Sequence, residues 1–194
     1  MDRYHITLFI HIVTLLVAAG ATAVMKLAIG RRARARTVGE ALEWHNVMAS
    51  TSKLFPICLA AFLITGTYML SIAQLHAWST GFVVAGLVGV VLLLVSGVFM
   101  GTRGKAAKQR LEEMAKNDVG QPAPPAVPPP LVAALPMINT GIALGVVFDM
   151  VMKPASVPGA LAVVAIGAAF GAAAGWRRRA PVVNGLNVEQ ESPS

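Results

Sequence analysis

Long and nearly uncharged apolar runs dominate the sequence and determine the fold that it predicts. Each run has about the 20 residues that a helix needs to cross roughly 30 Å of hydrocarbon. A lone strand would leave its backbone groups unpaired in lipid, so every run is expected to be a helix. The five runs cover residues 6–29, 54–72, 81–100, 131–151 and 157–176. We therefore expect an all-α membrane protein, a bundle of five transmembrane helices.

The segments between the runs predict two further features. Residues 38–52 carry Trp44 and small or apolar residues at helical spacing, which predicts a short helix lying at the membrane interface. The third helix is expected to continue to Lys116, helped by opposite charges one turn apart. It must end before the proline stretch at residues 122–130, which favours an extended polyproline conformation. We interpret this stretch as a semi-rigid linker, with recognition by an aromatic-lined groove as the alternative.

The chain is thus divided into four parts. Residues 1–116 form a three-span membrane region with its interfacial helix, and residues 117–130 form a Pro-rich cytoplasmic linker. Residues 131–179 form a two-span helical hairpin, and residues 180–194 form a polar C-terminal tail.

Composition supports this class of protein. Apolar residues make up 56% of the chain and charged residues 13%, whereas an ordinary soluble domain has about a quarter of its residues charged. The single cysteine, Cys58, has no partner for an internal disulfide and is expected to be a buried apolar thiol. A cleavable signal peptide is the competing interpretation of the first run. The strongly basic cluster follows that run instead of preceding it, which favours a retained anchor.

The basic residues predict the orientation in the membrane. They form three clusters, which follow the first, third and fifth runs, so five spans place all three on one face. Because Lys and Arg are enriched on the cytoplasmic side, we expect an outside N-terminus and a cytoplasmic C-terminus in a bacterial inner membrane. Topology and attraction to anionic lipid explain the net charge of +7 without nucleic acid. The clusters are Arg31, Arg32, Arg34 and Arg36; Arg103, Lys105, Lys108 and Arg110; and Arg177, Arg178 and Arg179.

Glycines at four-residue spacing indicate close helix contacts. The fifth run contains Gly167, Gly171 and Gly175, and the inner end of the third span has Gly97 and Gly101. Such spacing lets two helix backbones approach closely. We expect these glycines to pack within the chain, with a homodimer or a membrane partner protein as the alternative.

Candidate ligands gather at the outer side of the predicted topology. His5, His11 and His76 lie in the outer half or at the outer surface, where imidazoles can bind copper or hold a haem. Met69 and Asp149 lie at comparable depth. If their helices are neighbours, His11, Met69 and Asp149 line one outward-opening pocket.

His11 and Asp149 also have simpler interpretations that involve no ligand. A lone intramembrane histidine is more often a hydrogen-bonding group for a neighbouring helix. Asp149 can be solvated at its helix end or paired with Lys153 one turn later. Thr7, His11 and Thr14 follow one another at four and three residues, so they share one helical face, which is expected to point into the bundle.

A pattern of individual residues also spans residues 4–116. It consists of Leu8, His11 and Gly20 in the first run, the arginine-rich loop, residues 56–70 with Thr65, Gly66 and Thr67, and Trp78. This pattern resembles a bacterial family of small multi-span membrane proteins of uncharacterised activity. That family is similar to the membrane domain of copper-resistance protein D and, more distantly, to the HemJ-type protoporphyrinogen oxidases, which also carry a histidine in their first helix. The proline linker and the glycine-rich hairpin depart from the usual four-span form, so the oxidase activity is not carried over.

Three classes of function follow. The first is a non-enzymatic membrane protein that binds or passes a small ligand, metal or haem through an outer-side pocket around His11. The second is a structural or accessory subunit that packs through glycine-rich helices, and the third is a haem-dependent membrane oxidoreductase. The sequence has no zinc-hydrolase motif, CxxC pair, Walker loop or nucleophile elbow, which argues against a hydrolase or an NTP-driven machine.

Overall fold

The computed structural model is all-helical in the part that it describes, which is residues 3–72, 79–125 and 129–177. Within that part the helices are α1 (Arg3–Arg32), α2 (Val38–Ser52), α3 (Leu54–Ile72), α4 (Gly81–Asn117), α5 (Pro130–Met152) and α6 (Val157–Arg177). With α2 and α3 taken as one segment, five are long and apolar enough to cross a membrane. The expected class, an all-α chain with five membrane-length helices, is confirmed.

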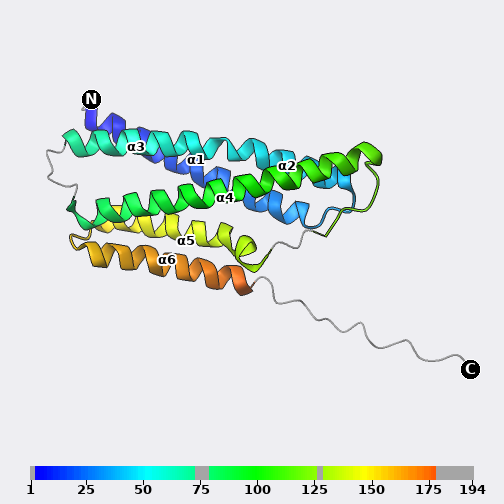
Figure 1. The fold of residues 1–194 in the computed structure, drawn as a ribbon. Helices are drawn as coiled ribbons and strands as arrows, with labels where there is room; N and C mark the ends of the chain where they lie inside the picture. The colour runs from blue at the N-terminus through cyan, green and yellow to red at the C-terminus, as the bar shows by residue number, and fades with distance from the viewer. Residues whose placement is uncertain (1–2, 73–78, 126–128, 178–194) are drawn as a thin grey trace, which may run out of the picture.

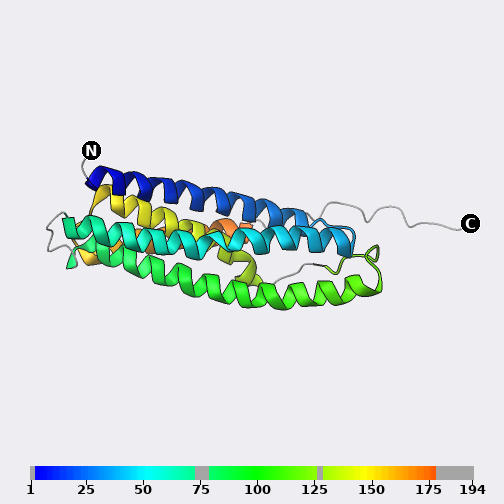
Figure 2. The ribbon, with the colours of Figure 1, turned by 90° about the horizontal axis from the view of Figure 1, so that it is seen from above.

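The helices pack in two groups (Figure 1). In one group α1 lies against α3, and in the other α4, α5 and α6 lie against one another. The short helix α2 links the groups, because it packs against α1 and α3 and also against α4. Figure 2 shows the same arrangement from above, with α2 continuing the line of α3.

Backbone-to-backbone contact between α5 and α6 explains the tightest packing in the protein. A Cβ atom at Gly141 of α5 would collide with the carbonyl of Gly167 on α6, and one at Gly171 would collide with the carbonyl of Met137. A Cβ at Gly145 would lie 2.9 Å from the Cα of Val164. Only glycine allows helices to approach this closely, so the α5–α6 hairpin depends on its small residues.

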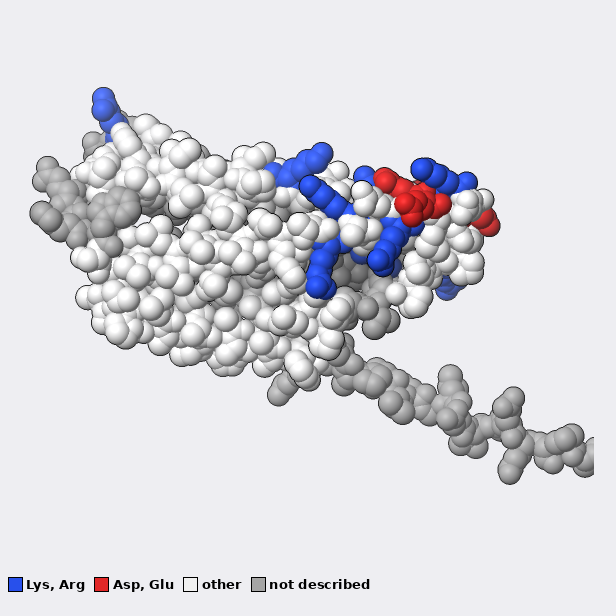
Figure 3. All heavy atoms as spheres, viewed as in Figure 1, with Lys and Arg blue, Asp and Glu red and all other residues white. Residues whose placement is uncertain are grey.

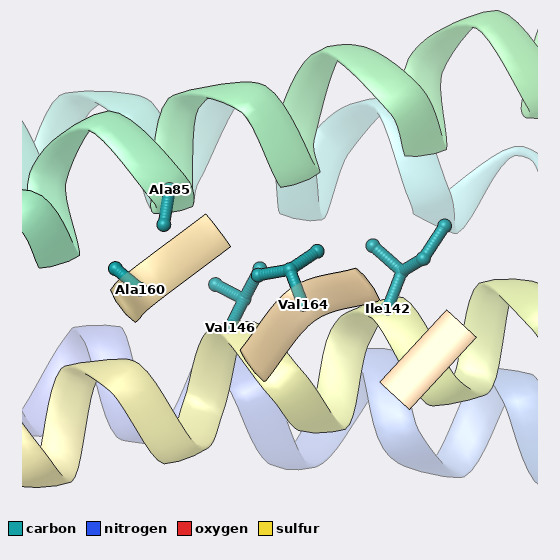
Figure 4. Close-up of a cluster of buried hydrophobic side chains, with 5 residues drawn as sticks. All are labelled: Ala85, Ile142, Val146, Ala160 and Val164. Carbon is teal, nitrogen blue, oxygen red and sulfur yellow. The ribbon is translucent and has the colours of Figure 1, made fainter. Parts of the chain in front are cut away.

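A small apolar core holds α4 onto this hairpin. Helix α4 contributes only the small side chain of Ala85 to this core, so larger side chains of α5 and α6 can reach the backbone of α4. Its five buried residues are Ala85 of α4, Ile142 and Val146 of α5, and Ala160 and Val164 of α6 (Figure 4).

One end of the molecule projects beyond the apolar body. Helix α4 has 37 residues, about 55 Å at about 1.5 Å per residue, which is far longer than roughly 30 Å of hydrocarbon. Its last turns, from Arg103 onward, pack with α2 and with residues 118–123 around a core of Val38, Ala41 and Leu111. We call this part the basic extension, because Lys and Arg side chains gather on it while the body is almost free of charge (Figure 3).

The sequence predicted the bounds of α2 but not its placement. We expected residues 38–52 to lie along the membrane interface. Instead α2 ends at Ser52, only Lys53 separates it from α3, and the two helices run in line (Figures 1 and 2). A capping box starts the helix: Thr37 Oγ1 accepts from the Glu40 N–H at 3.3 Å, and Glu40 Oε2 accepts from the Arg36 N–H at 3.0 Å.

The beginning of the proline-rich linker is attached to the basic extension. The Val38 N–H donates to the Gln121 carbonyl at 3.0 Å, and the Ala123 N–H donates to the Arg36 carbonyl at 3.0 Å. These bonds tie residues 119–123 to the turn between α1 and α2. The spacer predicted for residues 117–130 is therefore anchored over its first half, and residues 126–128 lie outside the described part.

Candidate functional site

A side-chain hydrogen bond from His11 joins α1 to α3. Its Nδ1 lies 2.7 Å from Oγ1 of Thr65. The Thr65 hydroxyl donates its single hydrogen to the Ala61 carbonyl of its own helix at 2.6 Å. The hydroxyl oxygen therefore accepts from His11, which places the imidazole hydrogen on Nδ1 and leaves the lone pair on Nε2.

The face of α1 that carries His11 points inward, as the sequence predicts. Thr7 and Thr14 are buried, and His11 between them is half-buried. Both threonine hydroxyls bond within their own helix, to the carbonyls of Arg3 and Ile10 at 2.9 and 2.8 Å. His11 alone on this face is thus available to a neighbouring helix or to a ligand.

Phe62 and Gly66 of α3 flank the imidazole. The ring of Phe62 meets that of His11 edge to face, with 5.0 Å between centroids. A Cβ at Gly66 would lie 3.9 Å from Cε1 of His11, an ordinary contact. Bonded through Nδ1 and held by an aromatic ring, the imidazole has a fixed orientation.

Of the other proposed ligands, Met69 lies near His11 and His5 is exposed. Met69 is half-buried and lies one turn beyond Thr65 on the same face of α3. His5 is exposed, and its ring meets that of Tyr4 at 5.8 Å. His76 lies outside the described residues. Within residues 3–72, 79–125 and 129–177 no group of three or more His, Cys, Asp or Glu can hold a metal ion.

Asp149 belongs to the other helix group. It lies on α5, which packs against α4 and α6, whereas His11 and Met69 lie on α1 and α3. Its exposed fraction is 0%, and among the described residues neither carboxyl oxygen has a hydrogen-bond partner. Solvation at the helix end and a bonded pair with Lys153 are therefore both wrong for this residue.

Of the five glycines that the sequence singles out, the three in α6 lie at a helix contact and the two in α4 do not. Gly167, Gly171 and Gly175 all face α5; a Cβ at Gly175 would lie 3.1 Å from the Cα of Ala134. A Cβ at Gly97 or Gly101 would meet no atom within 4 Å. Those two α4 glycines lie at no helix contact in the described part of the chain.

Sequence reasoning missed His45, which is buried in the basic extension with only 4% of its surface exposed. Burial is the largest cause that lowers its pKa, and the charges of Arg32 and Lys108 lower the pKa further. A hydrogen bond to the backbone of Gly104 and the charge of Glu112 oppose this effect. Its Nδ1 has no partner among the described residues.

A spacing signal for His45 was present in the sequence. Val38, Ala41 and His45 follow one another at three and four residues, and all three are buried. The side chains of Trp44 and Met48, on the neighbouring part of the helix surface, are only half-buried.

Comparison with known proteins adds no relative. No family model, curated protein or solved structure matches the chain. The class that the fold defines is a multi-pass helical membrane protein, and the family resemblance stays a prediction based on the residues quoted above.

Proposed function

We propose that this protein binds a small ligand through Nε2 of His11, at an outer-side site between α1 and α3 of a bacterial inner-membrane protein. The observation that carries the proposal is the 2.7 Å hydrogen bond between His11 Nδ1 and Thr65 Oγ1. Histidines that bind metals commonly donate their other ring N–H to a fixed partner, which orients the ring and raises its basicity.

Orientation in the membrane supports an outer-side site. The basic extension and the adjoining cluster at residues 31–36 together carry nine of the sixteen Lys and Arg residues, so this end is assigned to the cytoplasm. His11 is eight residues from the start of α1 at the opposite end, about 12 Å at about 1.5 Å per residue. At that depth an imidazole is costly to leave without a partner or a function.

The chemistry of the donors favours copper over haem. An imidazole suits copper and a thioether is a soft ligand that favours Cu(I), and Met69 lies one turn outward from the residue that bonds His11. A haem held by two histidines needs a second imidazole, whereas the side chains that contact the His11 ring are those of Thr65 and Phe62.

The test is a titration of the detergent-purified full chain with Cu(I) in competition with a chromophoric chelator, and in parallel with haemin. We expect one Cu(I) per chain in the parent and none in His11→Ala. Thr65→Val keeps the imidazole but removes its partner, and should weaken binding by about 10-fold to 100-fold. His45→Ala is the matched histidine control and should bind as the parent does.

The results of the Cu(I) and haemin titrations distinguish the three classes of function. Unchanged binding in a folded His11→Ala variant contradicts the proposal. A Soret band from haemin that depends on His11 favours the haem-dependent oxidoreductase, whereas the absence of both ligands favours the accessory subunit. Thermal unfolding of every variant shows whether lost binding is merely lost folding.

A further inference from the structure

Asp149 is a buried acid without a counterion, and this property does not depend on the site at His11. It is the only acidic residue among the buried side chains of the described part, with an exposed fraction of 0%. Both Oδ1 and Oδ2 lack a hydrogen-bond partner there. Buried carboxylates are normally paired or bonded, so this group needs a specific explanation.

The helix register shows what surrounds the carboxyl group. Between α4 and α5, Ser96 bonds Asn139, and a Cβ at Gly86 would lie 3.8 Å from Cε of Met150. These antiparallel pairs place Asp149 level with Gly86 and Leu87.

The register between α5 and α6 gives the same picture on the other side. Gly141 faces Gly167, and Gly145 faces Val164. Continuing this antiparallel pairing places Asp149 level with Gly159 and Ala160. The residues level with the carboxyl group on α4 and α6, which are Gly86, Leu87, Gly159 and Ala160, carry no side-chain donor.

No charged group on the neighbouring helices compensates a negative charge at this position. In α4 from Gly81 to Met100, and in α6 from Val157 to Trp176, no residue is titratable. On α5 itself the nearest cation is Lys153, which is exposed. Its backbone N–H bonds the Asp149 carbonyl at 2.8 Å, but its side chain does not bond the carboxylate.

An ionised Asp149 would be an unpaired charge in a dry apolar contact, so the packed arrangement fits the protonated acid. The charged form needs water or a cation, and both lie close by. Asp149 is three residues before Met152, the last residue of α5, which is about 4.5 Å at about 1.5 Å per residue. Lys153, one turn further, would pair with the carboxylate if this end of the helix opened.

The turn after α5 is the part that would move. Lys153 is the only non-glycine residue with positive φ in the described part, at 48°. The Gly81 N–H at the start of α4 donates to the Ala155 carbonyl at 3.1 Å, which holds the turn against α4. Breaking that contact would expose Asp149 to the outer side.

We propose that Asp149 is a reversible proton-binding site, and that proton release is coupled to opening of the outer ends of α4, α5 and α6. The packed state binds the proton as a carboxylic acid. The opened state releases it to outer-side water and holds the carboxylate beside Lys153. A proton is thus the ligand of this second site.

Reaction with dicyclohexylcarbodiimide tests the protonation state. This apolar reagent adds to a protonated carboxyl group in an apolar environment and consumes the acid proton as the acylurea forms. We expect one adduct per chain at neutral pH, located at Asp149 by peptide mass spectrometry and absent from Asp149→Asn. Glu112 and Asp118, which face water in the basic extension, should react only with a water-soluble carbodiimide and an amine.

Hydrogen–deuterium exchange tests the coupling. Raising the pH should reduce adduct formation and open the outer ends of the helices. In the parent, the amides of residues 146–153 should then exchange faster than the pH dependence of unprotected amides alone accounts for. In Asp149→Asn this additional increase should be absent. No adduct at neutral pH, an adduct at another residue, or adduct formation independent of pH overturns the site. Exchange that changes equally in both proteins overturns the coupling. Neither measurement depends on Cu(I) or haem, so the result is independent of that at His11.

Discussion

The side-chain amide of Asn139 on α5 donates a hydrogen bond of 2.8 Å to Oγ of Ser96 on α4. The other atom of the amide, Oδ1, is buried and has no partner among the described residues. This bond fixes the register between α4 and α5, the same register that places Asp149 level with Gly86 and Leu87. It is therefore the contact to test first in the α4–α6 group.

A double-mutant cycle with Ser96→Ala and Asn139→Leu measures the strength of that bond. We expect a coupling energy of about 0.6 kcal/mol and at most about 1.7 kcal/mol, because hydrogen bonds between membrane helices are weak against alternatives in the unfolded state. Reversible unfolding in mixed detergent micelles gives the free energies. Asn139→Leu also removes the unpaired Oδ1, so its own cost should be smaller than that of an ordinary lost hydrogen bond. Strictly additive free energies would show that the two side chains do not interact.

The glycines of α6 and α4 provide a matched pair for testing helix packing. Gly171→Leu should lower the free energy of unfolding by at least about 1–3 kcal/mol, because the new side chain must separate α6 from the backbone of Met137. Gly97→Leu introduces the same side chain where a Cβ meets nothing within 4 Å, and should leave stability nearly unchanged. Both are measured by thermal unfolding and by size-exclusion chromatography in detergent.

Two results would change this account of packing. A stable Gly171→Leu variant would mean that α5 and α6 are not in backbone contact. A Gly97→Leu variant that shifts from a larger to a smaller species would show that the open face of α4 is a contact between copies of the chain.

Helix positions were predictable because each helix must change from apolar to polar residues where it leaves the hydrocarbon. The helices α3 and α6 begin at the predicted residues, Leu54 and Val157. Helix α1 is longer than predicted by three residues at each end, since Arg31 and Arg32 continue it beyond the apolar run. Hydropathy marks where a chain enters lipid, and helices do not need to stop at that point.

The candidate site was less predictable, because hydropathy does not say which helices are neighbours. His11 was identified from its depth, but its bond to Thr65 depends on the pairing of α1 with α3. Asp149 was assigned to the same pocket from its depth alone. Its burial results from the start of α4, where Gly81 closes over the turn that follows α5, a contact between segments far apart in the sequence.

The topology prediction rests on the basic clusters. Reporter fusions after residues 36, 110 and 179 should all be cytoplasmic, and fusions after residues 76 and 154 should be periplasmic, because Lys and Arg stay inside. Paired alkaline phosphatase and fluorescent protein reporters give opposite signals on the two sides. A periplasmic signal after residue 179 would remove the fifth span. Periplasmic signals after residues 36 and 110 would reverse the assignment of the proposed sites to the outer side.

The last prediction concerns pH and the basic extension. His45 is buried there, and burial together with Arg32 and Lys108 lowers its pKa below the ordinary value of 6.5. Between the lowered pKa and about pH 6.5, His45 therefore binds a proton in the unfolded extension but not in the folded one. Its stability should be constant above about pH 6.5 and should fall below it, by up to about 1.4 kcal/mol per pH unit until the lowered pKa is reached.

Trp44 reports on this transition because it adjoins His45 in α2, with the guanidinium of Arg31 5.9 Å above its ring. With Trp78 and Trp176 replaced by Phe, its fluorescence during denaturant unfolding gives the stability at each pH. His45→Gln keeps a polar side chain of similar size but cannot titrate, so its stability should lose the decline below about pH 6.5. A decline that persists in His45→Gln would assign the pH dependence to the carboxylates of the extension, Glu112 among them, and not to the buried imidazole.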